Sequence, residues 1–297
     1  MDYTSNSDKI TRDYFDSLLL ESRYIDSKLP CTKMELYGRT FDTPIMTAAL
    51  SHLGNTAKNG MVIYAQAAAK ANAVHWVGMG DDKELEEITA TGAATIKIIK
   101  PHADNKEVFR KIEHAAGAGC FAVGMDIDHA FNGSGGYDQV LGLDMKAKSS
   151  EELRAFAQAA ANFGLPFIVK GVLSTKDAEK CLKAGCKGIQ LSHHHGIMQY
   201  AVPPLMMLKD ILEVIRGEIP VFIDCGIESG IDAYKCLALG ASAVSVGRHL
   251  MSLLKNGAEA TSNRIKEMNG ELAATMARTG VCDLQHFDSS VIHRRNF

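Results

Sequence analysis

The chain has 297 residues, of which 46% are hydrophobic and 23% are charged, and this balance is typical of a globular domain with a sizeable core rather than a disordered chain. Lys and Arg number 32 against 35 Asp and Glu, which gives a formal net charge of −3. A strongly basic surface for nucleic-acid binding is therefore not expected.

The first 43 residues carry apolar side chains at helical spacing, most clearly over 14–20, and predict a short helical extension. From residue 44 onward, short apolar runs alternate with helical stretches. The runs are too short for helices and too continuous for half-exposed strands, which is typical of buried parallel strands. They lie at 44–50, 74–79, 94–99, 121–126, 166–170, 188–192, 219–224 and 243–247.

Stretches of helical period, rich in Ala, Lys and Glu, separate these runs. About eight strand–helix units are what a (β/α)8 TIM barrel requires, so we predict an α/β chain with one barrel domain over 1–297, the extension over 1–43, and a long C-terminal helix over 258–278. A doubly wound sheet is the alternative, but no GxGxxG follows the first strand. The predicted barrel helices are 65–73, 82–89, 105–118, 150–162, 175–184, 204–216 and 230–239.

Residues 127–149 separate the fourth strand from its helix and include the glycine-rich run 132–136. A loop of this length in a compact domain is usually a functional lid. It can also be a tolerated surface insertion, and its composition does not decide between the two.

The active site of a TIM barrel lies at the carboxyl ends of the strands. Here those ends carry many titratable groups, which buried strands seldom contain without a functional reason. The last two strands end in Asp224-Cys225-Gly226 and Gly247-Arg248. Glycine-rich loops with one arginine after these strands predict a phosphate site. In the structural alternative, the glycines only form tight turns.

Several segments resemble the FMN-dependent 2-hydroxy-acid oxidases and dehydrogenases, the group of lactate and glycolate oxidases. The resemblance is strongest over about 165–280 and weaker over about 32–126. It is carried by FIVKGVLS at 167–174, LSHHHG at 191–196, IDCGI at 223–227, CLALGASAV at 236–244 and Gly247-Arg248.

This resemblance implies FMN as the cofactor and transfer of a hydride between a small hydroxy or carbonyl metabolite and flavin N5. His194 would be the acid–base residue, Asp126 would orient it, and Lys170 would stabilise the reduced ring. His129, His193 and His195 are expected to contact the substrate, and a homo-oligomer, by resemblance a tetramer, is expected. The expected cofactor contacts are Ala49, Leu50, Ser51, Lys97, Lys170, Ser192, Asp224, Gly226, Gly247 and Arg248.

The chain also departs from this family. Two arginines that bind the substrate carboxylate are missing, because Ile197 stands at one position and 127–136 contains neither Arg nor Lys. Each such loss removes a charge-assisted hydrogen bond of roughly 1.5–3 kcal/mol. The substrate is therefore not expected to be an ordinary 2-hydroxy acid. Glu228 replaces a phosphate-loop arginine, and Lys97 replaces a glutamine that touches the flavin.

Glu228 keeps open a second hypothesis, a barrel lyase or isomerase that acts on a phosphorylated substrate without flavin redox chemistry. A third hypothesis is a non-catalytic flavin-binding protein. A metal site could be built from His193–His195 with Asp126, Asp128 and His129. Consecutive histidines are not standard ligand spacing, so no metal is predicted.

The seven cysteines form no CxxC pair, and an odd number in a chain of this length is typical of a reducing compartment. The polar N-terminus lacks the pattern of a signal peptide, and no apolar run approaches the ~18 residues of a membrane span. We therefore expect a cytoplasmic protein whose partner is a small-molecule substrate rather than a membrane or a nucleic acid.

Overall fold

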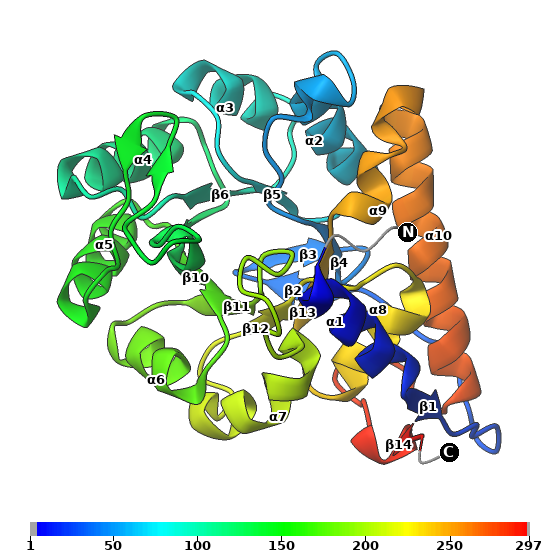
Figure 1. Ribbon diagram of the computed structural model, residues 1–297. Coiled ribbons are helices and arrows are strands. Elements are labelled where there is room, and N and C mark those ends of the chain that lie inside the picture. Colours follow the sequence, from blue (N-terminus) through cyan, green and yellow to red (C-terminus); the bar gives the residue numbers. More distant parts are fainter. Residues whose placement is uncertain (1–4, 296–297) are drawn as a thin grey trace.

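The computed structural model describes residues 5–295 and shows eight parallel strands that form a nearly closed barrel (Figure 1). Their order in the sheet is β4-β13-β12-β11-β10-β7-β6-β5. A parallel bridge between Leu50 and Val77 joins the two edges of the sheet. The predicted (β/α)8 fold is confirmed. The strands are β4 Ile45–Thr47, β5 His75–Val77, β6 Thr95–Ile99, β7 Ala122–Asp126, β10 Phe167–Val172, β11 Gly188–Leu191, β12 Val221–Ile223 and β13 Ala243–Val246.

Helices surround this barrel, and most of them begin at a side-chain cap such as the capping box of Ser149 and Glu152. One helix starts earlier than predicted, at Gly60 instead of residue 65. A side chain at Gly60 would clash with the carbonyl oxygen of Leu53, so glycine lets the helix begin against the preceding turn. The helices are α2 Gly60–Lys70, α3 Asp82–Thr89, α4 Asn105–Gly117, α5 Ser150–Asn162, α6 Thr175–Lys183, α7 Pro204–Ile215, α8 Gly230–Ala238, α9 Arg248–Met251 and α10 Gly257–Arg278.

The inside of the barrel is filled with side chains. Trp76 and Phe222 meet edge to face there with ring centroids 5.6 Å apart. Phe41, from the hairpin of β2 (Met34–Leu36) and β3 (Arg39–Phe41), belongs to the same buried cluster. Since this cluster includes residues at the beginnings of the strands, the amino end of the barrel is closed by apolar packing. The buried charged residues Asp126 and Lys170 lie at or near the carboxyl ends of their strands.

The N-terminal extension is helical as predicted only over α1 (Asn6–Asp16), which ends at the cap residue Ser17. The prediction of helical spacing through residue 20 is wrong, because Leu18–Leu20 is strand β1. This strand pairs antiparallel with β14 (Ile292–Arg294), which lies in the tail at the other end of the chain. The local pattern could not indicate a partner so distant in sequence.

The long segment 127–149 begins with a single helical turn, Ile127–His129, and then forms a small hairpin of β8 (Gln139–Val140) and β9 (Leu143–Asp144). Residues 127–129 of this segment therefore directly follow the end of β7, at the carboxyl end of the barrel. Over residues 5–295, none of the helices combines the length and the apolar character needed to cross a membrane.

Candidate active site

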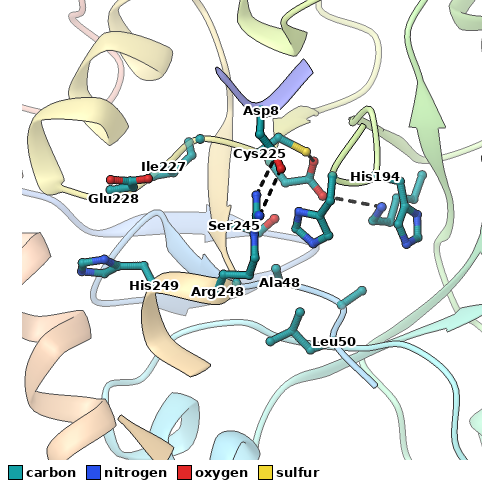
Figure 2. Close-up of a pocket in the computed structure, with 16 residues that line it drawn as sticks. Asp8, Ala48, Leu50, His194, Cys225, Ile227, Glu228, Ser245, Arg248 and His249 are labelled. Carbon is teal, nitrogen blue, oxygen red and sulfur yellow. Dashed lines mark hydrogen bonds and ion pairs between the residues drawn. The ribbon is translucent and has the colours of Figure 1, made fainter. Parts of the chain in front are cut away.

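A pocket lies at the carboxyl ends of β4, β10, β11, β12 and β13, where the sequence predicts the site (Figure 2). Its walls come from the loops after these strands and from helix α1. The lining residues are Asp8, Ala48, Ala49, Leu50, Lys170, His194, His195, Asp224, Cys225, Gly226, Ile227, Glu228, Ser245, Gly247, Arg248 and His249.

Lys170, near the end of β10, brings a buried positive charge to this pocket. The residue is 4% exposed, and its Nζ donates a hydrogen bond of 3.1 Å to Ser192 Oγ and lies 3.6 Å from Asp224 Oδ2. Burial lowers the pKa of Lys170, but the negative charges of Asp224 and Asp126 outweigh burial and raise it above its ordinary value. Lys170 therefore stays protonated in the pocket wall.

A tight turn after β11 presents the histidines. His194, His195 and Gly196 all have left-handed backbone conformations, with φ of 47°, 56° and 73°. Such conformations are strained for residues other than glycine and often occur at functional sites. Ser192 supports the turn, since its Oγ accepts a hydrogen bond of 3.1 Å from the backbone N–H of His194.

Two carboxylates flank the ring of His194. Its Nδ1 lies 3.1 Å from Asp128 Oδ1 and 3.5 Å from Asp126 Oδ2. The expected neighbour Asp126 is thus present, but Asp128 is nearer. Its position at the end of a barrel strand, two residues after Asp126, makes Asp128 a candidate site residue from the sequence, but the only role suggested there is that of a metal ligand.

The charges around His194 shift the pKa values of the whole group. Burial and the charge of Lys170 lower the pKa of His194, but its contacts with Asp126 and Asp128 outweigh both and hold it above the ordinary value. Burial raises the pKa of Asp126, whereas Lys170, Asp128 and His194 bring it well below the usual range. Burial and then the charge of Asp126 raise the pKa of Asp128. Of the two carboxylates, Asp126 is the firmly ionised one.

Two further side chains complete the cluster. Lys100, just after β6, donates a hydrogen bond of 2.7 Å to Asp126 Oδ2, and sequence reasoning missed it. The ring nitrogen Nε2 of His129 lies 3.1 Å from Nε2 of His194, so His129 covers the nitrogen that faces away from the carboxylates. Burial, more than any neighbouring charge, lowers the pKa of His129 to about 4, and its ring is therefore neutral near pH 7.

Most of the expected cofactor residues line the pocket, but three do not. Ser51 Oγ accepts a hydrogen bond from the backbone N–H of Met79. Lys97 is buried on the outer face of β6, beneath the surrounding helices, and donates a hydrogen bond of 2.6 Å to the carbonyl oxygen of Gly78. Ser192 lies behind the pocket wall, between Lys170 and His194. The expected residues that line the pocket are Ala49, Leu50, Lys170, Asp224, Gly226, Gly247 and Arg248.

The expected substrate histidines differ in their surroundings. His193 is buried against helix α1, where its Nε2 lies 2.8 Å from Thr11 Oγ1 and its Nδ1 accepts from the backbone N–H of Gly196. His195 lines the pocket. Burial and then the charge of Arg248 lower the pKa of His195 to about 4. His129 and His195 thus lie beside His194, whereas His193 anchors the N-terminal helix.

At the other end of the pocket, Arg248 forms a two-pronged ion pair with Asp8 of helix α1. Glu228 lines the same end of the pocket, and Arg264 of helix α10 contacts the loop that carries Glu228. The guanidinium of Arg264 donates to the carbonyl oxygen of Glu228 at 3.3 Å and to Glu271 at 2.9 Å. Asp8 and Arg264 lie outside the local motifs, so sequence reasoning missed both.

The pocket residues fit a flavin mononucleotide. Lys170 is a buried cation at one end and Arg248 a partly exposed cation at the other, which suits a polar ring edge and a phosphate group, respectively. Gly226 and Gly247 also line the pocket, and glycine at 226 lets helix α1 pack against this loop, because a side chain there would lie 2.8 Å from Thr11 Cγ2.

The atoms of Asp126, Asp128, His129 and His194 lie within 4.8 Å of one another and could in principle hold a metal ion. The ammonium group of Lys100 already contacts Asp126 at 2.7 Å, and the charge of Lys170 also acts on both carboxylates. Two buried cations oppose the binding of a third, so we assign no metal to this cluster.

Comparison with known families matches nearly the whole chain to one of them. Residues 3–161 and 143–294 match the FMN-dependent dehydrogenase family. Relatives include an L-lactate oxidase of Lactobacillus jensenii, 29% identical over 87% of this chain and 71% of the relative. A peroxisomal (S)-2-hydroxyacid oxidase of Arabidopsis thaliana is 28% identical over 83% of this chain and 76% of the relative.

Solved structures show the same similarity. A mandelate oxidase variant with the monooxide FMN adduct superposes with a TM-score of 0.86 at 26% identity, covering 98% of this chain and 92% of the other. Mandelate oxidase with (S)-2-phenylpropionate gives a TM-score of 0.87 at 25% identity, covering 98% and 90%. These matches favour an FMN-dependent oxidoreductase over a phosphate-substrate lyase or isomerase.

Proposed function

The chain belongs to the FMN-dependent dehydrogenase family, and on this premise we propose that it oxidises a small hydroxy or hydroxy-carbonyl metabolite without the usual doubly bound carboxylate. The observation that carries the proposal is the contact of His194 with Asp126 and Asp128, with His194 and Lys170 lining the same pocket. Bound FMN would supply the two-electron acceptor.

His194 is the proposed base. Contact of Nδ1 with Asp128 at 3.1 Å leaves Nε2 as the nitrogen that can accept a proton from a substrate hydroxyl. The positive charge that His194 then gains is stabilised by the firmly ionised Asp126. Without these carboxylates, burial and Lys170 would disfavour the protonated ring.

His129 occupies the position from which a substrate would reach His194. Its Nε2 lies 3.1 Å from Nε2 of His194, so a substrate hydroxyl must replace it or donate through it. His129 lies on the turn after β7, at the start of the long segment 127–149. We propose that this residue contacts the substrate and that His195, which lines the pocket next to His194, contacts it as well.

The cofactor would be held at both ends of the pocket. Lys170 and the loop of Ala49 and Leu50 would contact the flavin ring, while Gly226, Gly247 and Arg248 would hold the phosphate and Asp224 the chain between them. Lys170 keeps a positive charge beside the ring because Asp224 and Asp126 stabilise it.

The absence of an arginine at Ile197 supports the substrate class. Ile197 follows the histidine turn and is 45% exposed, so this position offers an apolar surface instead of a cation. A 2-hydroxy acid would lose the charge-assisted bonds that make its binding strong. A neutral hydroxy compound has no carboxylate, so the missing arginine does not weaken its binding.

The cytoplasmic location and the homotetramer expected from the sequence are also proposals.

Anaerobic mixing of the FMN-loaded protein with candidate substrates tests the proposal, with loss of the oxidised flavin absorbance as the measurement. Small alcohols and hydroxy-carbonyl compounds are expected to reduce the flavin faster than lactate or glycolate. The variant His194→Asn should bind FMN normally but reduce it at least about a hundredfold more slowly. Efficient reduction by lactate or glycolate alone would contradict the proposed substrate class.

A further inference from the structure

Helix α1 is held against the loops after β11 and β12, at the same end of the barrel as the pocket (Figure 1). Thr11 contacts His193 at 2.8 Å, and Ser7 Oγ donates a hydrogen bond of 2.8 Å to the carbonyl oxygen of Met198. Arg12 donates to the carbonyl oxygen of Gly226 at 3.0 Å and binds Asp232 with two hydrogen bonds. Through these contacts, α1 forms part of the pocket wall.

Asp8, in the first turn of this helix, points at Arg248 (Figure 2). Arg248 Nη2 donates to Asp8 Oδ1 at 2.8 Å, and Nη1 donates to Oδ2 at 3.1 Å. Asp8 is only 3% exposed, and both residues line the pocket. A phosphate group uses the same two-pronged geometry on a guanidinium as a carboxylate does. Asp8 therefore occupies the donor face of Arg248 that suits a phosphate.

A second carboxylate adds to the negative charge at this end. Glu228 lines the pocket on the loop after β12. The nearby guanidinium of Arg264 reaches the main chain of Glu228 and the carboxylate of Glu271. A phosphate group that enters this end must therefore displace one anion from Arg248 and approach another.

We propose that Asp8 is an internal competitor for the cofactor phosphate and that it sets the preference of this pocket between phosphorylated and unphosphorylated flavins. This inference rests on the proposed position of the FMN phosphate beside Arg248. When the phosphate binds, the Asp8–Arg248 pair opens, and helix α1 loses one of its contacts with the barrel. The apparent affinity for FMN is lower by the free energy needed to open that pair.

The test compares two flavins on the 297-residue chain after bound flavin has been removed. The dissociation constants of FMN and riboflavin are measured by quenching of flavin fluorescence. Asp8→Asn should tighten FMN binding about tenfold and leave riboflavin binding unchanged. Asp13→Asn is the matched control, since it removes the same charge from an exposed position on the same helix and should change neither constant.

Arg248→Met separates the inference from its premise. It should weaken FMN binding without affecting riboflavin; if it affects both flavins equally, the phosphate does not lie beside Arg248 and the premise fails. If Arg248→Met behaves as expected while Asp8→Asn leaves FMN affinity unchanged or weakens it, the competition itself is overturned.

Hydrogen exchange of the unaltered chain provides a second measurement that does not depend on a stable Asp8 variant. Backbone amides of α1 should exchange faster with saturating FMN than with saturating riboflavin, because only FMN takes Arg248 from Asp8. Equal exchange rates in α1 with the two flavins, or slower exchange with FMN, would overturn the inference.

Discussion

Lys100 Nζ donates a 2.7 Å hydrogen bond to Asp126 Oδ2, the same oxygen that lies 3.5 Å from Nδ1 of His194. One carboxylate oxygen thus links the end of β6 to the histidine turn after β11. The side chains of Lys100 and Asp126 are both largely buried, so this pair holds the acid–base cluster together.

Replacing Lys100 by methionine should destabilise the protein. The substitution leaves Asp126 buried with less positive charge around it, and removing one partner of a buried ion pair costs about 3 kcal/mol. The urea midpoint of the flavin-free chain measures the effect. Lys106→Met removes the same charge from an exposed position on α4 and should leave the midpoint unchanged. The double variant Lys100→Met/Asp126→Asn should recover part of the lost stability. If its urea midpoint is no higher than that of Lys100→Met, the unpaired Asp126 does not cause the destabilisation.

Asp128→Asn should move the pH dependence of flavin reduction. His194 accepts a proton only when neutral, and its pKa is held above the ordinary value, so kcat/KM should rise with pH through a limb above pH 6.5. The substitution removes a negative charge 3.1 Å from Nδ1, which lowers that pKa and shifts the limb toward lower pH. Asp144→Asn, exposed in the same segment, is the control and should leave the limb in place.

Ile197→Arg should restore binding of a 2-hydroxy acid. The new guanidinium would follow the histidine turn and could donate to a substrate carboxylate, lowering the KM for lactate about tenfold. Steady-state reduction of FMN with lactate measures this change. Ile25→Arg places the same charge on a distant residue that is 92% exposed, and it should have no effect. An unchanged KM in the Ile197 variant would mean that this position does not face the substrate.

Lys97→Met should stabilise the protein below pH 8. Burial, more than any neighbouring charge, lowers the pKa of Lys97 to about 8 from its ordinary value of 10.5. The charged form is therefore disfavoured in the folded state. This cost is present in full below pH 8 and is largely lost as the pH rises from 8 to 10.5, because the folded state loses its proton first and the unfolded state follows. It amounts to about 3 kcal/mol, of which the lost hydrogen bond to Gly78 offsets about 1 kcal/mol.

Urea unfolding at pH 7 and pH 10.5 should show that this advantage of the Lys97 variant shrinks with pH. An advantage that is equal at both pH values would contradict the explanation by burial. FMN affinity should change little, since Lys97 donates to Gly78 and does not line the pocket. A large loss of FMN affinity in the Lys97 variant would instead support the prediction that Lys97 contacts the cofactor.

Gly226→Ala tests how closely α1 packs on the pocket loop. A side chain at Gly226 would lie 2.8 Å from Thr11 Cγ2, and φ there is 77°. Gly185 has a similar φ of 83° but open space around it, so Gly185→Ala reports backbone strain alone. Each alanine should cost about 1 kcal/mol through strain, and the Gly226 variant should cost clearly more. Equal urea midpoints for the Gly226 and Gly185 variants would show that α1 can move away from residue 226 without a loss of stability.

The sequence by itself determined the barrel and the residues at its strand ends. Runs such as 94–99 and 121–126 match β6 and β7 closely, because a strand buried on both faces must be apolar along its length. The parallel arrangement then brings all carboxyl ends to one side, which is why Lys170, His194 and Arg248 could be assigned to one pocket from their positions alone.

Only the tertiary structure decided which of these groups meet. His194 and Asp128 are 66 residues apart in the chain, Lys100 and Asp126 are 26 apart, and Asp8 and Arg248 are 240 apart. No local period relates such positions, since hydrophobic patterning specifies which face of an element is buried and not which polar side chain it meets. The ion pairs depend on how loops and the N-terminal helix close over the barrel, and that closure is set by packing between segments far apart in sequence.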